Sequence, residues 1–158
     1  YRNEDFFTEL ESEGFDLFFI EFANTDDLHP GCSHCHNRPS FTDNLFHNNG
    51  LDSVASLEDF MDLGLGGVNG NIFDNGKFRS TTLRNIELTA PYMHDGRFNT
   101  LEEVVEHYAG GGHGVENENV NVTGFELTER KKQALVAFMR TLTDEEFIND
   151  PRFSNPFE

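Results

Sequence analysis

The sequence has no tryptophan, only two cysteines and few basic residues. Eleven lysines and arginines stand against 29 aspartates and glutamates, which gives a formal charge of −18 over 158 residues. Such a surface repels phosphate groups, so it excludes nucleic acid as a partner and argues against anionic membranes. The charge has two equally good explanations. It attracts a basic redox partner, or it only keeps the protein molecules dispersed by mutual repulsion.

Long apolar runs and a leader segment are also missing. No stretch of about 18 apolar residues occurs, so we expect no membrane-spanning helix. The chain opens at Tyr1 without a basic segment followed by an apolar one, so we expect that an export signal was removed or never included. The length fits one compact domain.

The two cysteines form one C-x-x-C-H motif, made by Cys32, Cys35 and His36. Two thiols at this spacing can add to the two vinyl groups of a haem, and the following histidine then lies beneath the iron as an axial ligand. A zinc site would need two further ligands that no companion motif supplies, and a redox dithiol has no use for the histidine. The motif therefore predicts one covalent haem c, with zinc and a redox dithiol as alternatives. Because haem is attached to such motifs outside the cytoplasm, it also predicts a periplasmic or extracellular protein.

Apolar periodicity indicates several helices. Residues 5–22 carry phenylalanines at helical spacing, with Gly14 as a joint, and Ser56 caps a short helix that reaches Gly64. A helix is expected over residues 100–108, and another begins after its cap at Thr128. The apolar residues of the first and last of these helices are Phe15, Phe18, Phe19 and Phe22, and Leu135, Phe138, Met139 and Leu142.

The remaining segments are rich in glycine and asparagine and are expected to be loops. One loop, over residues 37–50, would lay Phe41, Leu45 and Phe46 against the haem. Phenylalanine has 17 copies, and its rings pack on a porphyrin as well as on one another. A further loop, residues 64–76, has calcium-ligand types without the order of a calcium-binding loop, so we interpret it as a solvated loop.

The helix over residues 100–108 brings a tyrosine to its apolar face. At about 100° per residue, Tyr108 shares the face of Leu101, Val104 and Val105, whereas His107 falls off it.

Residues 77–97 contain four basic and two acidic residues, so this segment is positively charged within an acidic chain. The two propionates of a haem need charge-assisted donors, and the guanidinium fork of arginine suits carboxylates. We expect Arg79 and Arg84 to fill this role, with ordinary ion pairs as the alternative.

Several blocks follow the haem motif in a fixed order. They are Phe41-Thr42-Asp43-Asn44, Gly76-Lys77-Phe78-Arg79, Thr82-Leu83-Arg84-Asn85-Ile86, Leu88-Thr89-Ala90-Pro91-Tyr92-Met93-His94-Asp95-Gly96-Arg97, Thr100-Leu101-Glu102-Glu103-Val104-Val105 and Leu142-Thr143-Asp144. With these blocks the chain closely resembles the C-terminal haem domain of bacterial dihaem cytochrome c peroxidases and their MauG-like relatives.

The resemblance implies an all-α, cytochrome c-like helical domain around one covalent haem, with long irregular loops. It places this domain at residues 15–147, which leaves an N-terminal helical extension (1–14) and a C-terminal tail (148–158). It also implies a calcium site that uses main-chain oxygens of Thr89 and Pro91 and a side chain from a second domain. From its two prolines, Pro151 and Pro156, the segment over residues 144–158 is expected to lie over the domain.

The resemblance further implies that His36 is the proximal iron ligand and Tyr108 the distal one, because MauG-like members have tyrosine where the peroxidases have methionine. Met93 is the lesser alternative; His94, His107, Met61 and an open site also remain. A phenolate ligand favours iron(III), and a thioether raises the reduction potential. Tyrosine ligation therefore predicts a low-potential haem, or one that stores oxidising equivalents.

The intact enzymes carry a second haem domain with its own C-x-x-C-H motif, which this sequence lacks. We therefore expect an electron-transfer domain that works with a redox partner protein or a second haem domain. The alternative is one part of a peroxidase or MauG-like oxidase that reacts with hydrogen peroxide, so enzyme activity stays open. A weaker alternative is a self-assembling, electron-conducting cytochrome in which His113 or His29 reaches a neighbour.

Overall fold

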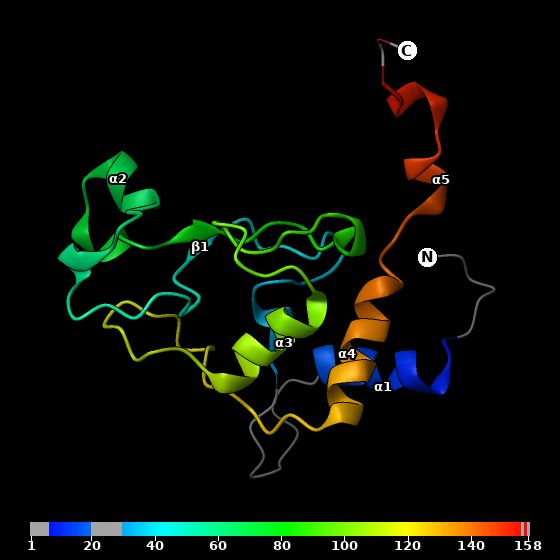
Figure 1. Ribbon diagram of the computed structural model, residues 1–158, viewed down its shortest axis with the longest axis horizontal. Helices are drawn as coiled ribbons and strands as arrows, with labels where there is room; N and C mark the ends of the chain where they lie inside the picture. The colour runs from blue at the N-terminus through cyan, green and yellow to red at the C-terminus, as the bar shows by residue number, and fades with distance from the viewer. Residues whose placement is uncertain (1–6, 20–29, 156, 158) are drawn as a thin grey trace.

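The computed structural model describes residues 7–19, 30–155 and 157 (Figure 1). Phe22, expected on the apolar face of the first helix, and His29, a candidate for contact with a neighbour, lie outside these residues. Among the described residues, no helix is both long enough and apolar enough to cross a bilayer.

Two helices from opposite ends of the chain pack against each other and form the base of the core. They are α1 (Glu9–Phe19) and α4 (Glu129–Arg140), which lie side by side in Figure 1. A Cβ atom at Gly14 would lie 1.9 Å from the carbonyl oxygen of Ala134. The interpretation of Gly14 as a joint is therefore wrong, because this glycine lies within α1 and lets the two backbones approach closely. The expected boundary between residues 14 and 15 likewise falls inside α1.

Six phenylalanines pack on one another around this contact, with ring centroids 4.8–6.4 Å apart. Phe18 and Phe138 are 1% and 0% exposed. The cluster consists of Phe7, Phe15, Phe18, Phe19, Phe41 and Phe138. Much of the phenylalanine content thus builds a core of its own instead of lining a ligand.

Helix α3 (Leu101–Gly110) lies against α4 and begins with a capping box. The Thr100 hydroxyl accepts from the Glu103 amide at 3.2 Å, and the Glu103 carboxylate accepts from the Thr100 amide at 3.0 Å. Thr128 caps α4 by accepting from the Lys131 amide. Both helices therefore begin where local capping residues predicted.

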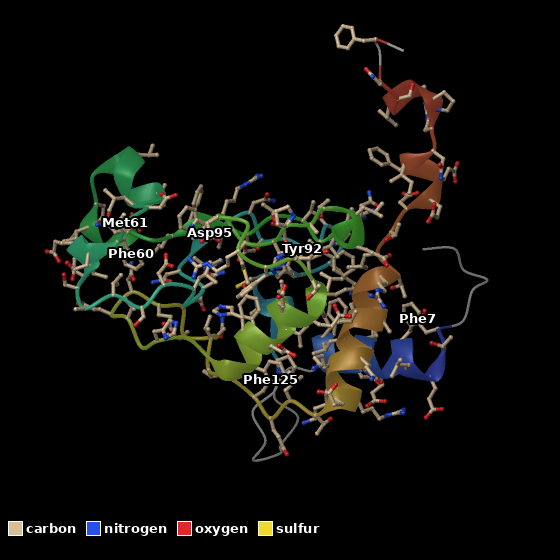
Figure 2. The ribbon with its side chains drawn as sticks, viewed as in Figure 1. Phe7, Phe60, Met61, Tyr92, Asp95 and Phe125 are labelled. Carbon is tan, nitrogen blue, oxygen red and sulfur yellow. The ribbon has the colours of Figure 1, made fainter. Side chains whose placement is uncertain are left out.

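A lobe on the other side of the molecule carries α2 (Leu65–Asn69) between two 3₁₀ turns, η2 (Leu57–Asp59) and η3 (Ile72–Asp74). Figure 2 shows Phe60 and Met61 in this lobe, far from Phe7. The helix expected over residues 56–64 is only the η2 turn, because Phe60 is already extended. The loop expected over 64–76 contains α2, whose first amide, that of Leu65, donates to the carbonyl of Lys77.

Two short strands join the lobe to the rest of the domain. Strands β1 (Phe46–His47) and β2 (Phe78–Arg79) pair antiparallel, with His47 opposite Phe78. The fold is mostly helical, and this small sheet corrects the expectation of an all-α protein. Such a sheet is hard to predict because each strand has only two residues.

The C-terminal segment leaves the body of the domain. It contains α5 (Glu145–Ile148) and the 3₁₀ turn η5 (Pro151–Phe153), and Figure 1 shows it extending away from α4. The rings of Phe147 and Phe153 pack against each other in a tilted arrangement and remain exposed. The expectation of a tail lying over the domain is therefore wrong for these residues.

Candidate haem-binding site

A cavity of about 590 Å³ lies between the C-x-x-C-H segment, the strands, α3 and α4. This volume is in the range of about 300–1,000 Å³ that is typical of ligand pockets. Its walls are largely apolar, with Leu83, Ile86, Leu101, Val104 and Met139 among them. Cys32, Cys35, His36, Met93 and Tyr108 all line this one cavity.

The C-x-x-C-H segment forms a 3₁₀ turn, η1 (Cys32–His34), and the His36 amide donates to the Cys32 carbonyl at 2.9 Å. The turn brings both sulfur atoms and the imidazole to the same wall. The His36 Nδ1 lies 3.1 Å from the Phe41 carbonyl oxygen. A carbonyl only accepts, so Nδ1 carries the hydrogen and Nε2 keeps a free lone pair. Burial lowers the pKa of His36, which favours the neutral imidazole that a metal ion needs.

The cysteine thiols are poor candidates for redox exchange. Burial raises the pKa of Cys32 to about 12 and that of Cys35 to about 11. Disulfide oxidoreductases depend on the opposite shift, since the thiolate is the reactive form. The raised pKa values of the two thiols therefore disfavour the redox-dithiol alternative.

Among the described residues, one group of side chains could bind a metal ion other than haem iron. Ligand atoms of Cys35, Asp43 and His47 all lie within 4.8 Å of one another. Cys32 is not part of this group, and the thioether of a haem form would take the Cys35 sulfur. Zinc would thus have three ligands and leave Cys32, the other cysteine of the motif, without a role.

The wall contributed by α3 carries Tyr108. Burial raises the pKa of Tyr108 to about 12 in the chain alone, although a hydrogen bond from Asn49 opposes the shift. A phenol held in this way stays protonated near neutral pH until a cation such as iron(III) displaces its proton.

The other candidates for the distal iron ligand differ in whether they line the cavity. Met93 and His94 line the cavity, and the His94 ring stacks on Phe78 at 3.6 Å between centroids. His107 is not among the lining residues, and its Nε2 donates to the Asn49 carbonyl at 3.0 Å. Met61 is fully exposed on the α2 lobe (Figure 2). The structure therefore brings Tyr108, Met93 and His94 to the site, and leaves His107 and Met61 outside it.

The two arginines expected at the propionates are placed differently. Arg79 lines the cavity, and its Nη1 lies 3.4 Å from the Asn44 side-chain oxygen. Arg84 is not a lining residue and donates to the Pro39 carbonyl at 3.0 Å. Of this pair, only Arg79 is in a position to meet a group bound in the cavity.

The loop expected to lay aromatic rings on the haem has a different arrangement. Phe41 is buried in the phenylalanine cluster, and Leu45 and Phe46 are 59% and 42% exposed. The expectation for these three residues is wrong. Side chains alternate along β1, so His47 rather than Phe46 reaches the cavity.

Sequence reasoning missed several polar residues of the cavity, namely His47, Asn49, Asn119 and Asn121. The Nδ2 of Asn119 donates to the His47 Nδ1 at 2.8 Å, and the His47 Nε2 then donates to Asp43 at 2.7 Å. Asn119 reaches this position because the loop after α3 returns to β1, where its amide donates to the Asn48 carbonyl. No periodic signal marks such a loop contact.

Two segments were considered for calcium: Thr89 with Pro91, and the loop over residues 64–76. Thr89 and Pro91 lie at the cavity and are otherwise exposed, and calcium there stays a prediction. In the loop over residues 64–76, Asn69 and Asn71 donate to one oxygen of Asp74, and Lys77 pairs with the other at 2.9 Å. A lysine on that carboxylate fits the interpretation of a loop without calcium.

Comparisons with known proteins were made on this basis. No protein-family model matches the chain. The cytochrome-c peroxidase IdrP2 of Pseudomonas sp. (strain SCT) is 34% identical over 145 residues, covering 77% of this chain and 38% of that protein. The methylamine utilization protein MauG of Methylorubrum extorquens is 33% identical over 127 residues, covering 73% of this chain and 31% of that protein.

Solved structures give the same answer. A MauG-like protein associated with microbial copper homeostasis superposes with a TM-score of 0.86 at 36% identity, over 99% of this chain and 53% of its own. The dihaem peroxidase BthA from Burkholderia thailandensis superposes with a TM-score of 0.64 at 26% identity, over 90% of this chain and 44% of its own.

The fold and the sequence thus define the class of the chain, which is related to haem-containing cytochrome c peroxidases. The chain belongs to the dihaem cytochrome c peroxidase and MauG family, as the ordered blocks predicted. It spans less than half the length of the curated relatives named above.

Proposed function

We propose that this chain is the electron-relay domain of the family, with one haem c bound covalently in the cavity. The observation that carries the proposal is that Cys32, Cys35, His36 and Tyr108 all line one largely apolar cavity. When bound, the haem supplies a one-electron Fe(III)/Fe(II) couple.

The protein groups have distinct roles in holding it. Cys32 and Cys35 would hold the haem through two thioether bonds, each made by adding one thiol S–H across a vinyl group. His36 offers Nε2 to the iron, and the Phe41 carbonyl fixes the orientation of its ring. Arg79 faces the cavity and supplies positive charge for a propionate.

Electron transfer is favoured over bond chemistry because the chain offers two axial ligands of its own. With both His36 and Tyr108 available to the iron, a haem held here would have its coordination filled by the protein and would supply electron exchange, not binding of a substrate. The oxygen donor favours iron(III) and a low potential. The chain has cysteines for one haem only, which suits a relay that acts with a second haem domain.

A second function has support from the names of the relatives. Several are cytochrome-c peroxidases, so this chain would form part of a peroxidase or MauG-like oxidase that reacts with hydrogen peroxide. In that case, either a further domain or an opened distal site would meet the peroxide.

The proposal extends to surroundings and partners. Covalent haem attachment places the protein in the periplasm or outside the cell. The charge of −18 suits a basic redox protein as partner. Calcium at Thr89 and Pro91 would need further ligands from a second domain, because these two residues supply only main-chain oxygens.

Spectroscopy of the exported, matured protein separates the two functions. We expect a six-coordinate iron(III) spectrum with phenolate bands in resonance Raman that hydrogen peroxide leaves unchanged. A vacant sixth position, or a spectrum that peroxide alters, would favour the peroxidase function instead.

A further inference from the structure

Asn49 lies between the two side chains that are the best candidates for the sixth ligand. Its Nδ2 is 3.3 Å from the Tyr108 hydroxyl oxygen and 3.4 Å from the Met93 sulfur. All three residues line the cavity. An amide nitrogen carries two hydrogens, so it can donate to both acceptors at once.

The orientation of the Asn49 amide follows from its neighbours. A thioether sulfur accepts hydrogen bonds weakly and donates none. If the amide were turned over, its oxygen would face the Met93 sulfur, and two acceptors would then oppose each other. The nitrogen therefore faces Met93 and Tyr108.

The backbone around Asn49 is held without the help of its side chain. Its carbonyl accepts from the His107 Nε2, which ties it to α3. The side chain of Asn48, 2% exposed, accepts from the Gly50 amide at 3.0 Å and donates to Asn117 at 2.8 Å. The Asn49 side chain is thus free to serve the cavity.

The two acceptors do not benefit equally from this donor. A phenolate oxygen on iron is anionic, and an N–H bond to an anion is about twice as strong as one between neutral groups. The bond to a thioether sulfur is weak whether or not the sulfur binds a metal. Asn49 therefore stabilises the arrangement with Tyr108 on the iron more than one with Met93 there, and it shifts the populations toward tyrosine.

We infer that Asn49 is a positioning residue that selects Tyr108 over Met93 as the axial ligand. The inference rests on the proposed function, because it needs a haem on the C-x-x-C-H motif. It adds a residue that no motif marks, and it makes the reduction potential depend on a single amide.

Asn49→Leu in the matured holoprotein tests the selection. Leucine keeps a similar volume and removes both donors. We expect the ratio of tyrosine-bound to methionine-bound iron to fall about tenfold, which is the size of effect expected from losing a hydrogen bond to an anion. The phenolate Raman bands should weaken, a thioether–iron(III) charge-transfer band should appear, and the potential should rise.

A second substitution distinguishes selection from general damage. In the double variant Asn49→Leu/Met93→Leu the competing thioether of Met93 is gone, so the phenolate bands should return. A merely structural role for Asn49 predicts that the double variant is damaged at least as much as the single one. Asn99→Leu makes the same chemical change at an exposed position outside the cavity, and it should leave the spectrum unchanged.

If the leucine variant fails to mature, Asn49→Asp provides the test of ligand selection instead. It keeps the shape and replaces the donors by an acceptor, which repels a phenolate, so the phenolate bands should again be lost. Wild-type bands and potential in either matured variant would overturn the role of Asn49 while leaving the proposed function intact. A wild-type protein without covalent haem, or without phenolate bands, would overturn the proposed function and this inference with it.

Discussion

Single residues decide the chemistry of this domain, and they differ in how visible they are in the sequence. Cys32, Cys35 and His36 are adjacent and form a motif, so their meeting in one place could be predicted. Asn49 meets Tyr108 across 59 positions of the chain, and no local pattern marks that contact. Arg84 had the right chemistry for a propionate but donates to a main-chain carbonyl. Residue type alone could not separate it from Arg79.

Tyr108→Phe tests the distal ligand. Phenylalanine keeps the ring and removes the oxygen, so the phenolate bands should disappear and the reduction potential should rise, because an anionic donor is lost from iron(III). Resonance Raman and a redox titration measure both. Tyr92→Phe is the matched control, since the Tyr92 hydroxyl donates to the Ile86 carbonyl at 3.1 Å. It should cost about 1 kcal/mol of stability and keep the bands. An unchanged spectrum in Tyr108→Phe would exclude Tyr108 as the ligand.

At the scale of elements, the starts of α3 and α4 were predicted, whereas the cap at Ser56 begins only a 3₁₀ turn in place of the expected helix. Thr100 with Glu103, and Thr128, fix the starts of α3 and α4 through contacts within three residues. The contact of α1 with α4 and the pairing of β1 with β2 depend on residues far apart in the sequence. Local patterns do not reveal such contacts, so Gly14 was interpreted as a joint and the sheet was not predicted.

Gly14→Ala should destabilise the protein by about 1–3 kcal/mol, because the new methyl group would overlap the Ala134 carbonyl and force α1 away from α4. Chemical denaturation measures the change. Gly110→Ala is the control, since no atom lies within 4 Å of a Cβ there. It should be neutral or stabilise by up to about 0.5 kcal/mol. Equal effects of the two substitutions would contradict the close packing of α1 on α4.

Thr100→Ala should lower the free energy of unfolding by about 1 kcal/mol, because the Glu103 amide loses its acceptor at the start of α3. Thr100→Ser keeps the hydroxyl and should stay close to wild type. Since α3 carries Tyr108, the alanine variant should also weaken the phenolate bands on mild warming before the serine variant does. If alanine and serine behaved alike, the cap would have no role in holding α3.

For the whole molecule, the charge of −18 dominates encounters with other proteins. Electron transfer to a small basic redox protein should slow severalfold as the ionic strength rises from about 0.01 to 0.15 M, because the Debye length falls from about 30 to about 8 Å. Stopped-flow mixing measures this rate. An acidic redox protein of equal potential serves as the control and should speed up with salt. A rate to the basic protein that is insensitive to salt would mean that the acidic surface only keeps the protein dispersed.

The account as a whole depends on one covalent haem, and counting it is the most direct measurement. Intact-mass spectrometry and a pyridine haemochrome assay on the exported, matured chain should find one haem per chain and no free thiol. The variant Cys32→Ser/Cys35→Ser, matured in the same way, should carry none. A colourless wild-type protein with both thiols free would contradict the central claim.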